Sequence, residues 1–291
     1  MKLLGSTGSR LLTGHSMHVN QLEIYLAKFH KSQDGIIFNS GFDANYGLFS
    51  CIANVNDCFL VDELIHSSVH EGIKGSRCKY WKSFKHNDTI DLKIKIDQFR
   101  FISNGHIFIA IESIYSMDGC LSKLKEITDL LDTYTDVHLI IDEAHSTGIC
   151  GPNGSGLVCE LELQDKVLAR VHTFGKAIGC HGAIILGSTI LKEYLINYAK
   201  PLIFSTFLPL HTLISIRLSY EYMIDHYEEL YPMLKSRIVL FRKLLQPYRD
   251  IPLLDSNSPI QGNIHSTCFQ NILIHKTSHV CDQVPIHIIY E

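Results

Sequence analysis

Short apolar segments alternate with segments of helical periodicity through the first two thirds of the chain. Strands are predicted at residues 35–41, 58–63, 106–113, 137–145, 167–174 and 182–188. Helices are predicted near residues 17–31, 43–53, 120–134 and 189–199. Runs such as HLIID and AIILG are apolar without alternation, which is typical of strands covered by helices on both faces. The pattern therefore predicts an α/β fold with a mainly parallel sheet covered by helices, in which binding groups gather where strands end.

The pattern changes after Pro201. Two long amphipathic helices are predicted at residues 209–227 and 230–247, and they are separated near Tyr231 and Pro232. These helices have no intervening strand, so the βαβ pattern of the first part of the chain ends here.

Chain length bounds the domain organisation. With 291 residues, the chain can form one large domain and a smaller one. The segment beyond Pro259 is rich in His, Asn and Ser, and no regular element is predicted in it. We expect a large domain over residues 1–200, followed by linker helices and an incomplete C-terminal domain over residues 201–291.

Composition excludes two classes of partner. The formal net charge is −4 and Lys and Arg form no cluster, so nucleic-acid binding is not expected. No apolar run approaches the ~18 residues that span a bilayer, so no membrane partner is expected, and the first residues turn to Gly and Ser too early for a signal peptide. The 9 cysteines are odd in number and include no C-x-x-C pair, which favours a reducing, cytoplasmic compartment.

The histidines do not predict a metal site. The sequence contains 17 of them, and His66 and His70 have the i, i+4 spacing of a metal-binding pair on a helix. A zinc site usually needs a third ligand nearby, and none is evident in the sequence.

The most specific local motif is HTFGKAIGCHGA, residues 172–183. It places Lys176 directly after a predicted strand and brackets it with glycines, which allow a tight turn and a close approach to a bound group. A lysine beside glycines also suggests a P-loop, but G-x-x-x-x-G-K-[ST] is absent, so nucleotide binding has little support. Lys176 is therefore a candidate for a reactive amine.

A second motif, IIDEAHSTG at residues 140–148, ends an apolar strand at Asp142. A buried carboxylate is costly without a cationic partner, and a protonated pyridine nitrogen, as in pyridoxal chemistry, is such a partner. His145 lies three residues further on and can face the same pocket. Taken alone, the motif also fits an acid that caps the next loop; a helicase box is unsupported because no Walker A motif is present.

Two weaker motifs also follow predicted strands. VDELIHSS, residues 61–68, delivers Asp62 and then His66 at a strand end. NSGFDAN runs through Gly41 into a predicted helix, whose free N–H groups suit a phosphate. Together with the preceding motifs, they bring an amine, an acid, two imidazoles and an anion-binding helix start to the same kind of sheet position.

The order of these motifs resembles the α-oxoamine synthases, pyridoxal-phosphate enzymes with the fold-type-I, aminotransferase class I/II fold. The resemblance covers about residues 5–260. It rests on GSTGSRLLTG, SGFDAN, DELIHSS, ESIYSMDG, DEAHSTG, TFGKAIG and FST, in this order. Within the family, DEAHSTG followed by FGKAIGCHGA, with SPIQ further on, is most similar to the subgroup that condenses L-alanine with a pimeloyl thioester (CoA or ACP), with decarboxylation, in biotin biosynthesis.

The resemblance implies pyridoxal 5′-phosphate as the cofactor and assigns roles to four residues near its ring. Lys176 would be the Schiff-base lysine and the base that moves the substrate α-proton. Asp142 would pair with the pyridine nitrogen, and His145 would hydrogen-bond the phenolic oxygen. His66 would stack on the ring.

The resemblance also implies contacts around the phosphate and beside the ring. Gly41 and Phe42 would offer backbone N–H groups to the phosphate, joined by Thr173. Ser116 and Glu112 would lie beside the cofactor. A further residue, Thr206, would reach the phosphate of the neighbouring subunit, which implies a homodimer with shared active sites.

The chain departs from the family at both ends, and we expect it to be truncated there. It begins almost at GSTGSR, and the match fades after SPIQ. The arginine that grips the substrate carboxylate in the family cannot be placed. Two alternatives stay open: another α-oxoamine synthase, of the 2-amino-3-ketobutyrate, 5-aminolevulinate or 3-ketosphinganine type, and a non-catalytic remnant.

Overall fold

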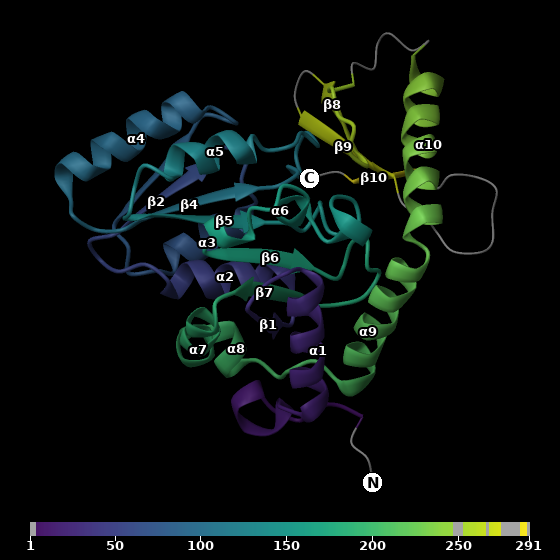
Figure 1. Ribbon diagram of the computed structural model, residues 1–291, viewed down its shortest axis with the longest axis horizontal. Helices are drawn as coiled ribbons and strands as arrows, with labels where there is room; N and C mark the ends of the chain where they lie inside the picture. Colours follow the sequence, from purple (N-terminus) through teal and green to yellow (C-terminus); the bar gives the residue numbers. More distant parts are fainter. Residues whose placement is uncertain (1–3, 247–252, 266–267, 275–285, 290–291) are drawn as a thin grey trace.

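The computed structural model describes residues 4–246, 253–265, 268–274 and 286–289 (Figure 1). Its centre is a seven-stranded sheet in the order β1-β7-β6-β5-β4-β2-β3. The strands are β1 (Asp34–Phe38), β2 (Cys58–Asp62), β3 (Tyr80–Phe84), β4 (Ile107–Glu112), β5 (Val137–Asp142), β6 (Ala169–Thr173) and β7 (Ala183–Gly187). β7 is antiparallel to both neighbours and the other neighbouring pairs are parallel. The expected mainly parallel sheet is therefore confirmed.

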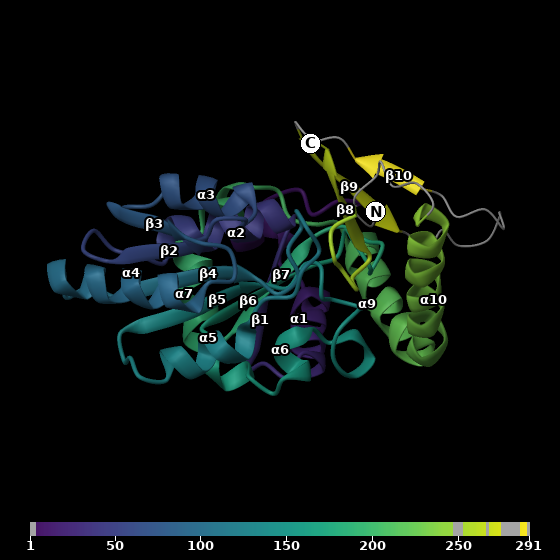
Figure 2. The same ribbon diagram turned by 90° about the horizontal axis from the view of Figure 1, so that it is seen from above.

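Helices cover both faces of this sheet. They are α1 (Met17–Phe29), α2 (Gly41–Cys51), α3 (Ser67–Lys74), α4 (Thr89–Ile102), α5 (Leu124–Leu131), α6 (Leu157–Glu160), α7 (Thr189–Tyr198) and α8 (Lys200–Phe204). Figure 2 shows α2 and α3 on one side of the sheet and α1 and α5 on the other. Leu60 and Val61 of β2 belong to different buried clusters, on opposite faces. Burial on both faces explains why the central strands lack alternation.

The sequence pattern does not predict β3, α3 or α4. β3 is an edge strand whose residues Tyr80 to Ser83 are exposed, so it lacks an apolar run. α4 has the sequence TIDLKIKIDQFRFI, in which apolar and polar residues alternate as they do in a strand. Asp88 nevertheless starts a helix there, because its side chain accepts the N–H groups of Ile90 and Asp91.

Two long helices follow, α9 (Leu210–Asp225) and α10 (Tyr227–Leu245). The break between them lies at His226, so the expected separation near Tyr231 and Pro232 is wrong. Pro232 lies inside α10, where it costs a backbone hydrogen bond without ending the helix. Across the described ranges, no helix is both long enough and apolar enough to cross a bilayer.

The described residues beyond Pro259 form strands, contrary to the expectation from sequence. β8 (Ile260–His265), β9 (Cys268–Ile274) and β10 (Ile286–Ile289) form an antiparallel sheet in the order β10-β9-β8. β8 contains Gly and Asn, which are depleted in strands, so its sequence does not mark it as one.

Arg242 attaches the segment before this small sheet to α10. Its Nη1 donates to the carbonyl oxygen of Ser256 at 2.8 Å and to Gln261 Oε1 at 2.7 Å. Ser256 Oγ in turn donates to the carbonyl oxygen of Gly119 at 2.8 Å. The segment therefore lies against the loop that joins β4 to α5.

A buried ion-pair network anchors the segment that precedes α1. Glu23 of α1 has no exposed surface, and its two carboxylate oxygens accept from the guanidinium of Arg10. Glu23 also accepts the N–H of Ile37 at 2.8 Å and pairs with Lys192 of α7 at 3.0 Å. One carboxylate therefore links the GSTGSR motif, α1, β1 and α7.

Glu23→Ala should lower the free energy of unfolding by about 3–5 kcal/mol, because it leaves the buried Arg10 cation without its partner. Urea titration measures this loss. Glu71→Ala is the matched control, since Glu71 is exposed and pairs with Lys74 at the surface, and its change should stay under ~0.5 kcal/mol. Equal losses in the two variants would contradict the importance of the network.

Candidate active site

A cavity of about 270 Å³ opens at the carboxyl ends of the central strands. Its walls come from the start of α2, the start of α3, the ends of β4, β5 and β6, and the β6–β7 connection. The lining residues are Ser40, Gly41, Phe42, Asn45, His66, Ser68, Glu112, Asp142, Ala144, His145, Thr173, Gly175, Lys176, His181 and Gly182. The cavity lies at the sheet edge where ligands bind in open α/β folds.

Two carboxyl groups lie side by side in this cavity, at the ends of neighbouring strands. Glu112 of β4 is in register with Asp142 of β5, and both are buried. Glu112 Oε2 accepts the N–H of Ser116 at 2.9 Å, while Oε1 has no partner in the described part of the chain. Burial, together with the charge of Asp142, raises the pKa of Glu112 to about 8. The raised pKa favours the protonated form of Glu112 at neutral pH, which lessens repulsion between the two carboxyl groups.

Asn45 of α2 connects Asp142 to the imidazole of His66. Its Nδ2 donates to Asp142 Oδ2 at 2.8 Å and to Ser68 Oγ at 3.0 Å. Ser68 Oγ lies 2.7 Å from His66 Nδ1, and the Ser68 N–H donates to the same nitrogen at 3.2 Å. Because Nδ1 accepts, the proton of a neutral His66 lies on Nε2. The other oxygen of Asp142 accepts the N–H of Ala144 at 2.9 Å, so both oxygens are held.

The imidazole of His145 is neutral in this buried environment. Burial lowers the pKa of His145 well below its usual range, and the charges of Lys176 and His66 lower it further. At physiological pH its imidazole is therefore neutral, with one nitrogen able to donate and the other to accept.

Lys176 lies on the short connection between β6 and β7. The Phe174 N–H donates to the carbonyl oxygen of Gly182 at 2.9 Å, and the Cys180 N–H donates to that of Phe174 at 2.7 Å. Gly179 and Gly182 have φ values of +66° and +114°, in the region that favours glycine. The glycines of the motif therefore close the hairpin whose turn carries Lys176 to the cavity wall.

The start of α2 and the end of β6 form a cradle with free hydrogen-bonding capacity. Ser40 caps α2 by accepting the N–H of Asp43 at 3.0 Å, and the N–H groups of Gly41 and Phe42 have no partner inside the helix. A Cβ at Gly41 would lie 2.6 Å from Thr173 Cγ2, so only glycine allows this approach. The buried Oγ1 of Thr173 has no hydrogen-bond partner among the described residues. Such a set of donors suits an oxyanion.

The structure brings most of the predicted site residues into the lining of this one cavity. They are Gly41, Phe42, His66, Glu112, Asp142, His145, Thr173 and Lys176. Ser116 is outside the lining and contacts Glu112 through its backbone N–H. Thr206 is also outside the lining, and its carbonyl oxygen accepts Asn39 Nδ2 at 2.7 Å.

Sequence reasoning does not single out the lining residues Ser40, Asn45, Ser68 and His181. Asn45 lies four residues after Gly41, so helical spacing could have placed both on the same side of α2. His181 lies inside the glycine-rich motif and carries no separate signal.

The sequence matches the family described as aminotransferase class I and II over residues 1–262. It is 42% identical over 247 residues to a protein of Emericella nidulans named 8-amino-7-oxononanoate synthase, and the matched region covers 81% of this chain and 60% of that protein. The chain therefore spans less than two thirds of the length of this relative.

Solved structures agree with the sequence match. A serine palmitoyltransferase from S. paucimobilis has a TM-score of 0.83 and 25% identity, over 90% of this chain and 67% of that one. An 8-amino-7-oxononanoate synthase from Francisella tularensis has a TM-score of 0.72 and 28% identity, over 87% of this chain and 72% of that one. The resemblance to the α-oxoamine synthases is confirmed by these matches. The chain belongs to the aminotransferase class I and II family.

Proposed function

We propose that the cavity binds pyridoxal 5′-phosphate, held covalently through Lys176 Nζ, and that the chain joins an amino acid to an acyl thioester with loss of carbon dioxide. The observation that carries the proposal is a buried carboxylate beside a lysine in one cavity. Asp142 is held by two neutral donors, Asn45 and Ala144. A buried anion of this kind is stabilised when a cation completes its surroundings, and a protonated pyridine ring is such a cation.

The other end of the cavity fits the cofactor phosphate. The first N–H groups of α2 and the buried Oγ1 of Thr173, which has no partner in the described ranges, offer three donors. The helix start adds a favourable dipole for an anion. The solved serine palmitoyltransferase from S. paucimobilis carries a bound PLP–myriocin aldimine, which supports the proposal.

Bound pyridoxal phosphate would supply an electron sink for the negative charge that develops at the amino-acid α-carbon. Asp142 would keep the ring nitrogen protonated, and the uncharged Glu112 beside it would add no second negative charge. Neutral His145 would donate a hydrogen bond to the phenolic oxygen, and His66 would lie against the ring. Lys176 Nζ would accept the α-proton and later return it.

L-Alanine and a pimeloyl thioester are the substrates we propose, as in biotin biosynthesis. The 42% identity to a protein named 8-amino-7-oxononanoate synthase favours this pair. The similarity to serine palmitoyltransferase, with a TM-score of 0.83, favours the alternative of another α-oxoamine synthase that uses a different amino acid and acyl chain. A non-catalytic chain that keeps only the cofactor site is the remaining alternative.

We further propose that the chain forms a homodimer with shared active sites, in which Thr206 contacts the cofactor phosphate of the partner subunit. Thr206 is outside the lining of its own cavity, and Asn39, which follows β1, fixes its carbonyl oxygen. The resemblance of the motif FST to the family supports this role for Thr206.

Lys176→Ala should abolish the yellow colour that pyridoxal phosphate gives with the unmodified chain, because the covalent link is lost. Borohydride reduction followed by peptide mass mapping should find the cofactor on the peptide that contains Lys176. Lys166→Ala is the matched control, since Lys166 pairs with Asp132 at the surface, and it should keep both signals. Labelling of a different lysine would contradict the proposed cofactor site.

Asp142→Asn should keep cofactor binding but lower turnover by roughly 10²–10⁴-fold, because asparagine cannot hold the ring nitrogen protonated. Glu112→Gln is the informative comparison, since a protonated Glu112 and a glutamine carry the same charge. Its loss of turnover should stay within about ten-fold, a barrier change of ~1.4 kcal/mol. If Glu112→Gln costs as much as Asp142→Asn, the assignment of the charge to Asp142 fails.

The substrate proposal predicts that alanine and pimeloyl thioester together release free thiol and yield an amino ketone that mass spectrometry detects. Glycine or serine with acetyl, succinyl or palmitoyl thioesters should give less product per unit time. A preference for serine with palmitoyl thioester would support the alternative enzyme. Normal cofactor binding without turnover of any pair would support the non-catalytic alternative.

A further inference from the structure

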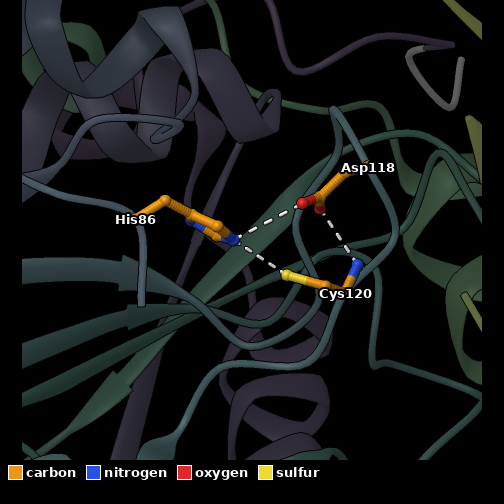
Figure 3. Close-up of side chains that lie close together, drawn as sticks. All are labelled: His86, Asp118 and Cys120. Atoms are coloured by element: carbon orange, nitrogen blue, oxygen red, sulfur yellow. Dashed lines mark hydrogen bonds and ion pairs between the residues drawn. The ribbon is translucent and has the colours of Figure 1, made fainter. Parts of the chain in front are cut away.

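Three side chains outside the proposed cofactor site lie close together near the loop between β4 and α5. His86 follows β3, and Asp118 and Cys120 lie in the loop between β4 and α5 (Figure 3). His86 Nε2 lies 2.9 Å from Cys120 Sγ and 3.4 Å from Asp118 Oδ2. Dashed lines in Figure 3 mark these two contacts and the hydrogen bond from the Cys120 N–H to Asp118, and the carboxylate and the thiol both point at the imidazole edge.

The separations are close to those of ligands around one small ion, except that Cys120 Sγ lies nearer to His86 Nε2 than two ligands of one ion do. The three ligand atoms all lie within 4.8 Å of one another. Zinc binds nitrogen and oxygen at ~2.0–2.2 Å and sulfur at ~2.3 Å in a tetrahedron, which places ligand atoms roughly 3.3–3.7 Å apart. A small outward shift of the Cys120 thiol therefore opens room for the ion. The side chains of His86 and Asp118 are 20% and 19% exposed, so the position is reachable from solvent.

The other ring nitrogen of His86, Nδ1, contacts a carboxylate, as is common for histidines that bind a metal. Nδ1 lies 2.9 Å from Oδ1 of Asp62, which is buried at the end of β2. Asp62 is itself held by the N–H groups of Leu64 and Asn87, each at 3.0 Å. A carboxylate on the far nitrogen orients a ligating imidazole and makes it a stronger donor.

The other two ligands have outer contacts as well. Asn87 Nδ2 donates to Cys120 Sγ at 3.3 Å, which would stabilise a thiolate. The Cys120 N–H donates to Asp118 Oδ1 at 3.0 Å, and this leaves Oδ2 directed at His86. Each ligand of the cluster therefore has one further contact that sets its direction.

We propose that His86 Nε2, Asp118 Oδ2 and Cys120 Sγ bind one zinc ion, with the fourth position open to water. A mixed set of nitrogen, oxygen and sulfur ligands is typical of zinc, whereas magnesium and calcium prefer oxygen alone. In the sequence, His66 and His70 have the spacing of a metal-binding pair, but no third metal ligand is evident beside them. This cluster lies elsewhere, and His86 is separated from Asp118 and Cys120 by more than thirty residues of sequence.

The ion would fix the loop between β4 and α5, which contacts Glu112 of the cavity. Ser116 of this loop donates its N–H to Glu112 in the cavity, and Cys120 lies four residues further on. The zinc site does not depend on the proposed cofactor, so each proposal can fail without the other.

The competing arrangement is an ion pair without metal. Burial lowers the pKa of His86, but hydrogen bonds to Asp118 and Asp62 raise it more, to about 12. An imidazolium between two carboxylates would then be stable by itself, and zinc binding has to displace its proton.

The test uses the full chain, freed of metal with a chelator and titrated with cobalt(II) chloride. Equimolar cobalt should produce a strong near-ultraviolet thiolate-to-cobalt band, and zinc chloride should remove the band by displacement. Because only a sulfur ligand gives this band, cobalt bound to other histidines does not interfere. Absence of the band would overturn the proposal and leave the ion pair.

Variants assign the band to its ligands. Cys120→Ser should abolish it and weaken zinc binding at least 100-fold, and Asp62→Asn should weaken binding about 10–100-fold. Cys120→Asp should lose the band but keep zinc binding, since a carboxylate replaces the thiolate, which also controls for a folding defect. Cys78→Ser is the matched control, because Cys78 is also half-buried and contacts the carbonyl oxygens of Asp57 and Tyr80. A band that survives in Cys120→Ser, or vanishes in Cys78→Ser, would refute the site.

Discussion

A single negative charge buried at the end of β5 is the constraint on which the rest of the cavity depends. Asp142 ends a strand whose interior is apolar, and hydrogen bonds from Asn45 and Ala144 hold its two oxygens. Burial, together with the charge of Asp142, raises the pKa of its neighbour in register, Glu112, to about 8, so that the protonated form of Glu112 is favoured at neutral pH. The start of α2 and the turn that bears Lys176 are arranged around this charge, so the cavity is organised to accept a group that is cationic at one end and anionic at the other.

The fold and the site differ in how much of them the sequence predicts. The positions of the buried strands could be predicted because their apolar runs are typical of strands covered on both faces. Asp142 and Lys176 could be singled out because each lies at the end of such a strand or just after it. β3 and α4 could not, since an exposed edge strand carries no apolar pattern and the alternation in α4 is that of a strand. Asn45 could not be given its role either, because its contact with Asp142 spans 97 residues of sequence. Local pattern locates groups at strand ends, whereas their pairing depends on the folded sheet.

The loop between β4 and α5 links three parts of the molecule. Its Ser116 holds Glu112 in the cavity, and its Cys120 faces the imidazole of His86. Its Gly119 has a φ of +74°, and its carbonyl oxygen accepts the hydroxyl of Ser256 from the segment that precedes β8. A displacement of this loop would therefore change the contacts of Glu112 in the cavity, of His86 and of Ser256.

The reversed direction of β7 has a consequence for how the molecule folds. Because β6 and β7 are antiparallel neighbours, Thr173 and Ala183 pair across a short connection, residues 174–182, and Lys176 lies within it. Contacts so local in sequence close quickly, whereas pairing of β4 with β5 and docking of α2 must first close long loops. The lysine hairpin can therefore form early, while the acid and the helix start reach it only when the sheet is complete. Lys176 is thus in place on its hairpin before the cavity around it is complete.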